Sequence, residues 1–550
     1  MDRTLSVMSA WIMRALILCS LFGGLTWFHQ ARSQRPARVD LAREKGILII
    51  GNGAEPATLD PHLATGVPEH HLFDALFEGL VAATVENSDA NGPGVATHWD
   101  TSDSTTWTFH LRKDARWSDG VPLTAHDFVW SFQRILSPLL GAEYAEMLYP
   151  MVKAREFNQG TLTDFSQVGA KALDDHTLRI TLNGPAPYFP SMLKHYSWHP
   201  VPRHVIERFG RMTDRDTKWT RVGSIVGNGP FQMKEWRYTH SITVARNPHY
   251  WDAATVKLNE IIFVPIVSDA TEERAFRDGQ IHATESVPLS QVPEYREKHP
   301  EVFHENALLS TYFYRVNVTR PPMNNKLVRQ ALAMAIDRSG LIRNILRAGQ
   351  KPTTGFTPPG AGEGYEAPDM LRFDPDGARK LLAEAGYPDG RGFPKFEILI
   401  NTLESHRTIA EAIQEMWKKN LHIDVGVLNQ DWGVYLDSQK RLDYQVCRAG
   451  WVGDFLDPFT FLSLWQTGDG NNQTGWSNPR YDALLQGSLR EGDTKKRLAL
   501  LTEAETLLLD ELPVLPIYWY VRPTLVRPEV LGMKSSLLEH RCYKAIHFAK

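Results

Sequence analysis

Hydrophobic and polar positions alternate with a two-residue period in several short segments of the chain. The alternation is clear at residues 107–112 and 178–182, which predicts half-buried strands. Residues 47–50 form a continuous apolar run that stops at glycines, as fully buried strands often do. Apolar runs at 423–427 and 513–521 predict two more strands in the second half of the chain.

Other segments repeat their apolar residues at helical spacing. Thr124 and Asp127 form a capping box, which predicts a helix that continues through Phe132. Further helices are predicted over residues 325–336, 376–385, 409–417 and 493–509. Residues 374–377 resemble the start of a calcium loop but lack its later ligands, so they predict a turn and helix N-cap instead. Strands that alternate with helices in this way predict an α/β fold class.

The first 35 residues differ from the rest of the chain. Residues 15–28 are almost uniformly apolar, and Arg14 precedes them. The run is shorter than the ~20 residues of a membrane-spanning helix and suits a secretory signal. Residues 1–35 therefore predict export to the periplasm, as a cleaved signal peptide or as an N-terminal anchor in the inner membrane.

Composition and motifs exclude several classes of function. The chain has 550 residues, enough for two to four domains, and its net charge of −4 offers no basic excess for binding nucleic acid. Beyond the N-terminal Cys19, Cys447 and Cys542 could form one disulfide at most. The sequence lacks the CxxC, HExxH and GxSxG motifs, so no metal, cofactor or catalytic nucleophile is expected.

Residues 448–458 hold the most informative chemistry. Arg448, Trp451 and Asp454 lie close together in an apolar segment broken by glycines. Charged groups in such a setting are costly unless they meet partners. A ligand with an amine at one end and a carboxylate at the other would supply both partners, but pairing with other protein groups is an equal alternative. Asp457 precedes Pro458, which favours turn capping, and the pair His70–His71 is interpreted as a surface or boundary feature.

Several blocks of sequence resemble the peptide-binding solute receptors of ABC importers, in family 5 of the extracellular solute-binding proteins. The similarity extends from about Leu48 to the C-terminus, and the segment 448–458 narrows it to the oligopeptide subgroup. The other blocks that carry the resemblance are residues 58–61, 107–120, 172–177, 185–189, 246–251 and 380–387.

The resemblance implies a two-lobed, type II periplasmic-binding-protein-like fold with three domains and a closing hinge. The hinge crossings are expected near residues 310–314 and 516–520. Two cysteines that form a disulfide in the oligopeptide-binding subgroup are replaced here by Ser310 and Val452. The expected divisions are residues 44–70, 195–308 and 516–550 for lobe one, 71–194 for an inserted domain, and 309–515 for lobe two.

By position in the family's motifs, Asp454 is expected to hold the α-amine of a bound peptide. Arg448 would receive the carboxylate of shorter peptides and His406 that of longer ones. The remaining expected peptide-binding residues are the pocket walls Trp432 and Trp451, Gly450 beside them, and Glu55 in a loop facing the ligand backbone. Tyr518 and Tyr520, in the hinge-proximal strand, are expected to reach the groove, with core packing as an equal alternative for each.

The resemblance also implies the partners. The chain would capture short peptides and deliver them to an inner-membrane ABC permease with ATPase subunits, acting as a monomer without cofactor or enzymatic activity. Main-chain hydrogen bonds are common to all peptides, so binding through them tolerates many sequences. A receptor for murein peptides is the alternative within this class. More distant alternatives are a hydrolase acting in the cleft and a membrane-anchored interaction protein.

Overall fold

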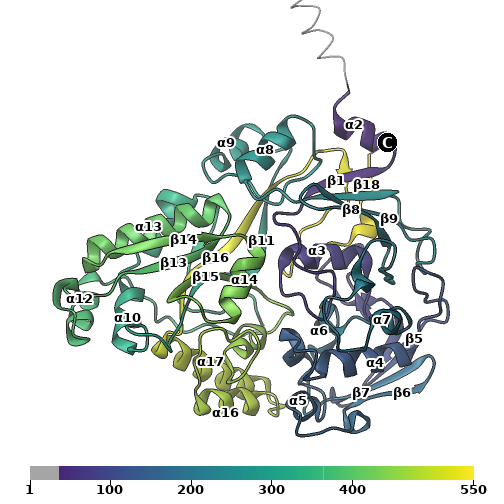
Figure 1. Ribbon diagram of the computed structural model, residues 1–550, viewed down its shortest axis with the longest axis horizontal. Helices are drawn as coiled ribbons and strands as arrows, with labels where there is room; N and C mark the ends of the chain where they lie inside the picture. Colours follow the sequence, from purple (N-terminus) through teal and green to yellow (C-terminus); the bar gives the residue numbers. More distant parts are fainter. Residues whose placement is uncertain (1–35, 363, 550) are drawn as a thin grey trace, which may run out of the picture.

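The computed structural model describes residues 36–362 and 364–549 (Figure 1). The predicted signal or anchor segment, residues 1–35, lies outside them. The described chain is mixed α/β, which confirms the predicted fold class, and its larger sheets are two of four strands and one of six. No helix in these ranges combines the length and apolarity needed to cross a bilayer.

One four-stranded sheet joins the start of the chain to its middle. Its order is β1–β10–β9–β8, and β1 runs parallel to β10 with Ile47 opposite Glu260. Because β1 comes before residue 52 and its partners come after residue 230, this part of the molecule is discontinuous in sequence. The strands are β1 (Ile47–Gly51), β8 (Phe231–Arg237), β9 (Ser241–Arg246) and β10 (Glu260–Val264).

The other four-stranded sheet is formed entirely by residues between β1 and β8. Its antiparallel order is β4–β5–β7–β6, and Trp107, Phe109 and Leu111 of β5 point into the core as their alternation predicted. The Asp127 carboxylate accepts a hydrogen bond from the Thr124 backbone N–H at 2.8 Å, which confirms the predicted start of helix α4. The elements are β4 (Ala96–Asp100), β5 (Thr106–Leu111), β6 (Ala170–Asp174), β7 (Thr177–Thr181) and α4 (Ala125–Leu136).

The six-stranded sheet has the order β12–β16–β11–β15–β13–β14 and is packed against several helices. Asn325, Asp374 and Asp493 cap the N-termini of three of these helices through their side chains, and the cap at Asp374 confirms the predicted turn and N-cap. The strands are β12 (Lys351–Pro352), β13 (Phe396–Asn401), β14 (Val425–Gln430) and β15 (Val446–Val452). The helices are α10 (Lys326–Met334), α12 (Pro375–Glu384), α13 (Glu404–Leu421), α14 (Trp432–Lys440) and α17 (Thr494–Glu511).

Two of these elements begin more than one residue away from their predicted starts. Helix α13 begins at Glu404 instead of Ile409, and an acidic residue in the first turn is favourable because it faces the positive end of the helix dipole. His406 therefore lies in the first turn of the helix. Strand β14 begins at Val425 instead of Ile423, because the preceding residues are used to end α13 at His422 in the left-handed conformation.

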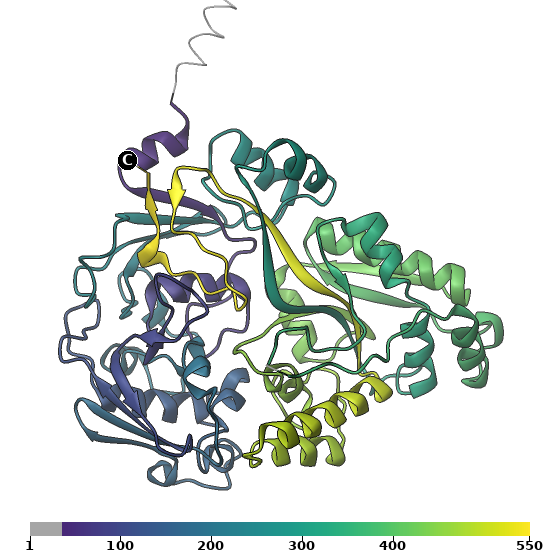
Figure 2. The same cartoon turned by 180° about the vertical axis from the view of Figure 1, so that it is seen from behind.

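Two long strands connect the two halves of the molecule. Strand β11 (Phe303–Val316) pairs with β16 (Val514–Leu525) from Phe303 opposite Leu525 to Arg315 opposite Val514. The register shifts between Ala307 and Thr311 and again after Tyr312. Figure 2 shows the two strands side by side as they pass between the halves. The segments expected to cross the hinge are thus parts of one twisted ribbon.

Candidate functional site

A cavity of about 310 Å³ lies between the two halves of the molecule. Its walls come from the loop after β1, the start of helix α3 (Val67–Leu76), the inserted segment near Tyr144 and His195, and the strands β15 and β16. It is lined by most of the residues that the sequence predicted: His406, Trp432, Arg448, Gly450, Trp451, Asp454, Tyr518 and Tyr520. Positions more than a hundred residues apart are thereby brought into one cleft.

Glu55 does not belong to this set. Its carboxylate accepts hydrogen bonds from the Trp236 indole at 2.5 Å and from the Thr239 backbone N–H at 3.1 Å. The loop does reach the cleft through Gly53 and Ala54, but the Glu55 side chain points toward β8. The loop therefore lies at the cleft as the resemblance implied, but the Glu55 carboxylate is turned away from it.

Asp454 is 8% exposed and is surrounded by polar groups from both sides of the cleft. Its carboxylate accepts hydrogen bonds from Thr460 Oγ1 at 3.0 Å and from the Tyr144 hydroxyl at 3.4 Å. His195 Nε2 lies 3.3 Å from the same carboxylate. Asp454 follows β15 and Thr460 lies in the short helix α15 (Phe459–Leu462), whereas Tyr144 and His195 belong to the inserted segment, so the contacts bridge the two halves.

Burial raises the pKa of Asp454 to about 7, although the hydrogen bond from Thr460 and the charge of His70 oppose the rise. His195 does not supply a cation, because burial and the neighbouring histidines hold its pKa well below the ordinary value. Within the described chain, the carboxylate thus has hydrogen-bond donors but no lysine or arginine partner. An ammonium group placed here would meet an acceptor held ready for it.

Asp457 shows the opposite arrangement, three residues further along the chain. Its two carboxylate oxygens accept hydrogen bonds from Arg497 at 2.7 and 2.8 Å. It also accepts the Phe459 backbone N–H at 2.9 Å, which confirms the predicted turn-capping role. Asp457 is therefore fully paired within the protein and does not form a catalytic pair with Asp454.

Arg448 lies in the middle of β15 and is partly buried. Its guanidinium donates to the Tyr520 hydroxyl at 2.7 Å and to Asn401 Oδ1 at 3.2 Å, and it lies 4.8 Å from the centre of the Tyr312 ring. These partners are neutral, and Arg448 has no ion pair within the described residues. Its planar guanidinium can donate two parallel hydrogen bonds to the carboxylate of a ligand in the cleft.

His406 lines the cleft beside Arg448 and is 6% exposed. Burial and the charge of Arg448 hold its pKa well below the ordinary value, so the ring is neutral. Its Nδ1 is buried and has no hydrogen-bond partner in the described part of the chain. His406 can therefore donate a hydrogen bond to the carboxylate of a longer peptide, but it does so without a positive charge.

Arg315 is a second arginine in the cleft that the sequence reasoning missed. It is 5% exposed and donates to Gln473 Oε1 at 2.8 Å and to the Asn471 carbonyl at 3.3 Å. Its Nε is buried without a partner, and the described chain provides no carboxylate within ion-pair distance. The available signal was a charged residue at the end of the apolar strand β11.

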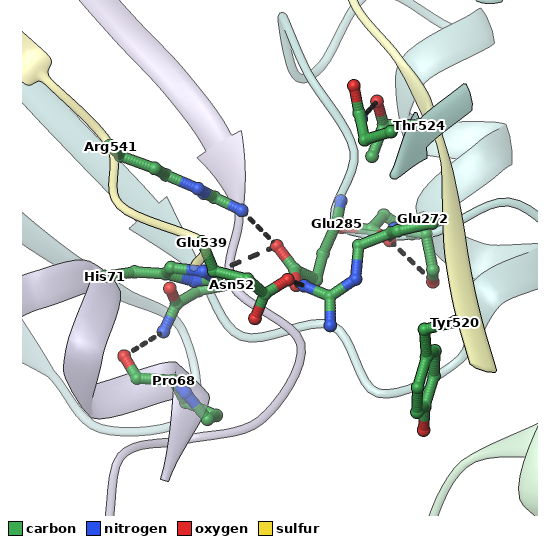
Figure 3. A network of polar contacts seen from close by, with 12 residues as sticks. Asn52, Pro68, His71, Glu272, Glu285, Tyr520, Thr524, Glu539 and Arg541 are labelled. Carbon is green, nitrogen blue, oxygen red and sulfur yellow. Dashed lines mark hydrogen bonds and ion pairs between the residues drawn. The ribbon is translucent and has the colours of Figure 1, made fainter. Parts of the chain in front are cut away.

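A third arginine of the cleft, Arg522, is neutralised within the protein. Its guanidinium forms ion pairs with Glu285 and Glu539, and Glu285 also pairs with Arg541. Figure 3 shows this network, with Arg541 pointing at Glu285 beside His71. Two cations and two carboxylates balance each other, so this part of the wall carries no unpaired charge.

The surface-or-boundary interpretation is wrong for His71, which is buried, whereas His70 is half-buried as a boundary residue. The His71 side chain is 1% exposed and that of His70 12% exposed, because the C-terminal segment covers helix α3. His70 lines the cleft. Cys447 and Cys542 are both free thiols, so the disulfide that the sequence left open is not formed.

Comparison with known proteins identifies the family. Residues 92–473 match the description "Bacterial extracellular solute-binding proteins, family 5 Middle". The chain belongs to this family. The periplasmic oligopeptide-binding protein OppA of Escherichia coli is 38% identical over 504 residues, which cover 90% of this chain and 91% of that protein. Family 5 members are binding proteins, which does not favour the hydrolase alternative.

Solved structures of family 5 proteins agree with this assignment. The Haemophilus influenzae OppA complex with the peptide RPPGFSPFR superposes with a TM-score of 0.88 at 34% identity, covering 92% of this chain and 99% of that one. The Escherichia coli murein tripeptide-binding protein MppA gives a TM-score of 0.87 at 34% identity, covering 92% and 98%. These neighbours confirm the type II fold.

The lobes are not arranged as in an open receptor. The unliganded open form of MppA superposes with a TM-score of only 0.62 at 35% identity, covering 92% of this chain and 98% of that one. Contacts across the cleft agree, because Lys440 of α14 pairs with Glu143 at 2.6 Å and Asn471 donates to Glu146 at 2.7 Å. The cleft geometry described above is therefore that of closed lobes.

Proposed function

We propose that this chain is an extracytoplasmic receptor that captures short peptides in the cleft and delivers them to an ABC importer. The observation that carries the proposal is the pair Asp454 and Arg448. Both charges line one cleft, and neither has an oppositely charged lysine, arginine, aspartate or glutamate partner in the described chain. A free peptide carries the complementary amine and carboxylate, and the relatives named for oligopeptide binding support this ligand class.

Asp454 also provides a reason for the lobes to close only around a ligand. Closure without a ligand buries its carboxylate beside neutral Tyr144 and His195, which raises its pKa to about 7. The ammonium of a peptide removes that penalty, so the closed form has the higher affinity for the ligand. A ligand shifts a two-state equilibrium by its differential affinity for the two states.

A receptor for cell-wall peptides is a second candidate. Arg315 is a further cation of the cleft without a carboxylate partner, and it suits a ligand with more carboxylates than its terminal one. The structural similarity to the murein tripeptide-binding protein supports this candidate. In this candidate, two carboxylates of the cell-wall peptide would bind Arg448 and Arg315 at the same time.

The same proposal covers location and partners. We infer export by residues 1–35, a periplasmic site of action and delivery to a permease with ATPase subunits, since the relatives are described as periplasmic binding proteins. The division into lobe one, an inserted domain and lobe two is part of this inference. The sheets support it, because each of the larger sheets falls into one expected division apart from the crossing strands β11 and β16.

Mass spectrometry of the small molecules released when the purified mature protein is denatured tests this proposal. A mixture of short peptides is the expected result, and its length range would be read directly. A single muropeptide would favour the second candidate. Protein that binds no free-amine peptide, alone or after denaturation and refolding, would contradict a peptide receptor.

A further inference from the structure

Three side chains from two distant parts of the chain converge beside the cleft. His70 and Asp74 lie one turn apart on helix α3, and His540 comes from the C-terminal segment that covers this helix. His70 Nε2 lies 3.5 Å from one Asp74 oxygen, and His540 Nδ1 lies 3.5 Å from the other. The three donor atoms all lie within 4.8 Å of one another.

These separations are longer than good hydrogen bonds but close to the spacing of ligands around a metal ion. With metal–nitrogen and metal–oxygen bonds of about 2.0–2.1 Å, tetrahedral ligands are about 3.3 Å apart. His70 Nε2 forms no hydrogen bond with any described residue. The Asp74 carboxylate is oriented by the Arg541 backbone N–H, which donates to it at 2.7 Å, as outer-sphere groups orient metal ligands.

We propose that His70, Asp74 and His540 bind a divalent transition-metal ion of the zinc type. Two imidazoles and one carboxylate are ligands that zinc and its neighbours prefer. His70 and His540 line the cleft, so a donor group of a bound molecule can fill a remaining coordination position. Asp74 and His540 also border a smaller cavity of about 60 Å³, which gives the ion a second route of access.

Two other groups of potential ligands serve as comparisons. His71, Glu285 and Glu539 also lie close together, but Arg522 and Arg541 already pair with both carboxylates (Figure 3). His98, Asp100 and His110 form an exposed group, in which the side chains of His110 and Asp100 are 37% and 70% exposed. Only the proposed site combines burial with a carboxylate that no arginine or lysine side chain occupies.

The test is a titration of the chelator-treated mature protein with Zn²⁺, and with Co²⁺ followed by its visible absorption. One ion per chain is expected. His70→Asn and His540→Asn are each expected to weaken Zn²⁺ binding at least about tenfold. The matched control His98→Asn removes a histidine of the exposed group and is expected to leave the affinity unchanged. The unfolding midpoint of each variant reports whether it is folded.

Three results would overturn the proposal: no Zn²⁺ or Co²⁺ binding by the wild-type protein, undiminished binding in folded His70→Asn and His540→Asn proteins, or loss of binding in His98→Asn. X-ray absorption of the zinc-loaded wild-type protein provides a readout without variants. Two imidazoles and a carboxylate in the coordination shell are expected, and a shell without imidazole would refute the site. The measurement uses the metal alone, so it is independent of whether the cleft binds peptides.

Discussion

The substitution Asp454→Asn removes one charge from the cleft while keeping the size and the hydrogen bond from Thr460. The pKa of Asp454 is raised from 3.8 to about 7 in the closed form. A rise of about 3 pKa units corresponds to an upper limit of about 4 kcal/mol for closing the lobes over the unpaired anion. A bound ammonium removes this cost, and deleting one partner of such a buried pair costs about 3–5 kcal/mol.

Two measurements follow from this magnitude. Calorimetry is expected to show that Asp454→Asn weakens binding of a free-amine peptide by about 100-fold or more. The same variant should bind the N-acetylated peptide about as well as the wild-type protein does, since that ligand has no ammonium to lose. The two proteins and two ligands form a double-mutant cycle that isolates the interaction between the carboxylate and the amine.

Small-angle scattering of the ligand-free protein tests the closure argument separately. The closed form binds a proton at Asp454 more tightly than the open form does, so closure takes up protons between its ordinary pKa and about 7. Ligand-free wild-type protein should therefore become more compact as the pH falls from about 8 to about 5. The ligand-free Asp454→Asn variant should be more compact than the wild-type protein at the higher pH, and its compactness should change less with pH.

Other groups near Asp454 set the limits of that response. His195 stays neutral, positive charge on His70 opposes the rise in the pKa of Asp454, and Tyr144 titrates far above this range. Burial also raises the pKa values of Glu146 and Asp469, so the variant retains a residual response. Equal loss of affinity for free and acetylated peptides would refute the role of Asp454 in holding the amine. An unchanged compactness in the variant would refute its role in closure.

Three further substitutions separate the remaining roles. Arg448→Met is expected to weaken the binding of peptides whose carboxylate reaches β15 and to leave the binding of longer peptides unchanged. Calorimetry over a series of peptide lengths measures this, and an equal loss of affinity at every length would contradict the role. Arg315→Gln should weaken the binding of a peptide that carries a glutamate side chain by about tenfold more than the binding of its glutamine counterpart. Equal losses of affinity for the two peptides would exclude a contact between Arg315 and the carboxylate. Asp457→Asn leaves Arg497 buried without its partner and should lower the free energy of unfolding by about 3–5 kcal/mol in denaturant titrations. The interaction energy between Asp454 and the peptide amine should stay the same. Unchanged stability would contradict the buried pair.

Local patterns predicted the secondary structure well, because strand alternation, helix periodicity and caps depend on neighbouring residues. The capping box at Thr124 and the alternation in β5 are examples. The same reasoning misplaced the starts of α13 and β14, because α13 begins earlier, with Glu404 in its first turn, and ends at His422 immediately before β14. Sequence motifs do not indicate the proposed metal site, because His540 lies far from His70 in sequence.

The sequence by itself determined the fold class, the family and the identity of the charges in segment 448–458. Only the tertiary structure decided which of those charges are paired. Tyr144 and His195 contact the Asp454 carboxylate although they lie more than 250 residues before it in the sequence. Arg497 forms an ion pair with Asp457, and the Trp236 indole donates a hydrogen bond to Glu55. Whether a charge is free to meet a ligand depends on its burial and on partners that the tertiary fold brings together, and neither is encoded in local sequence spacing.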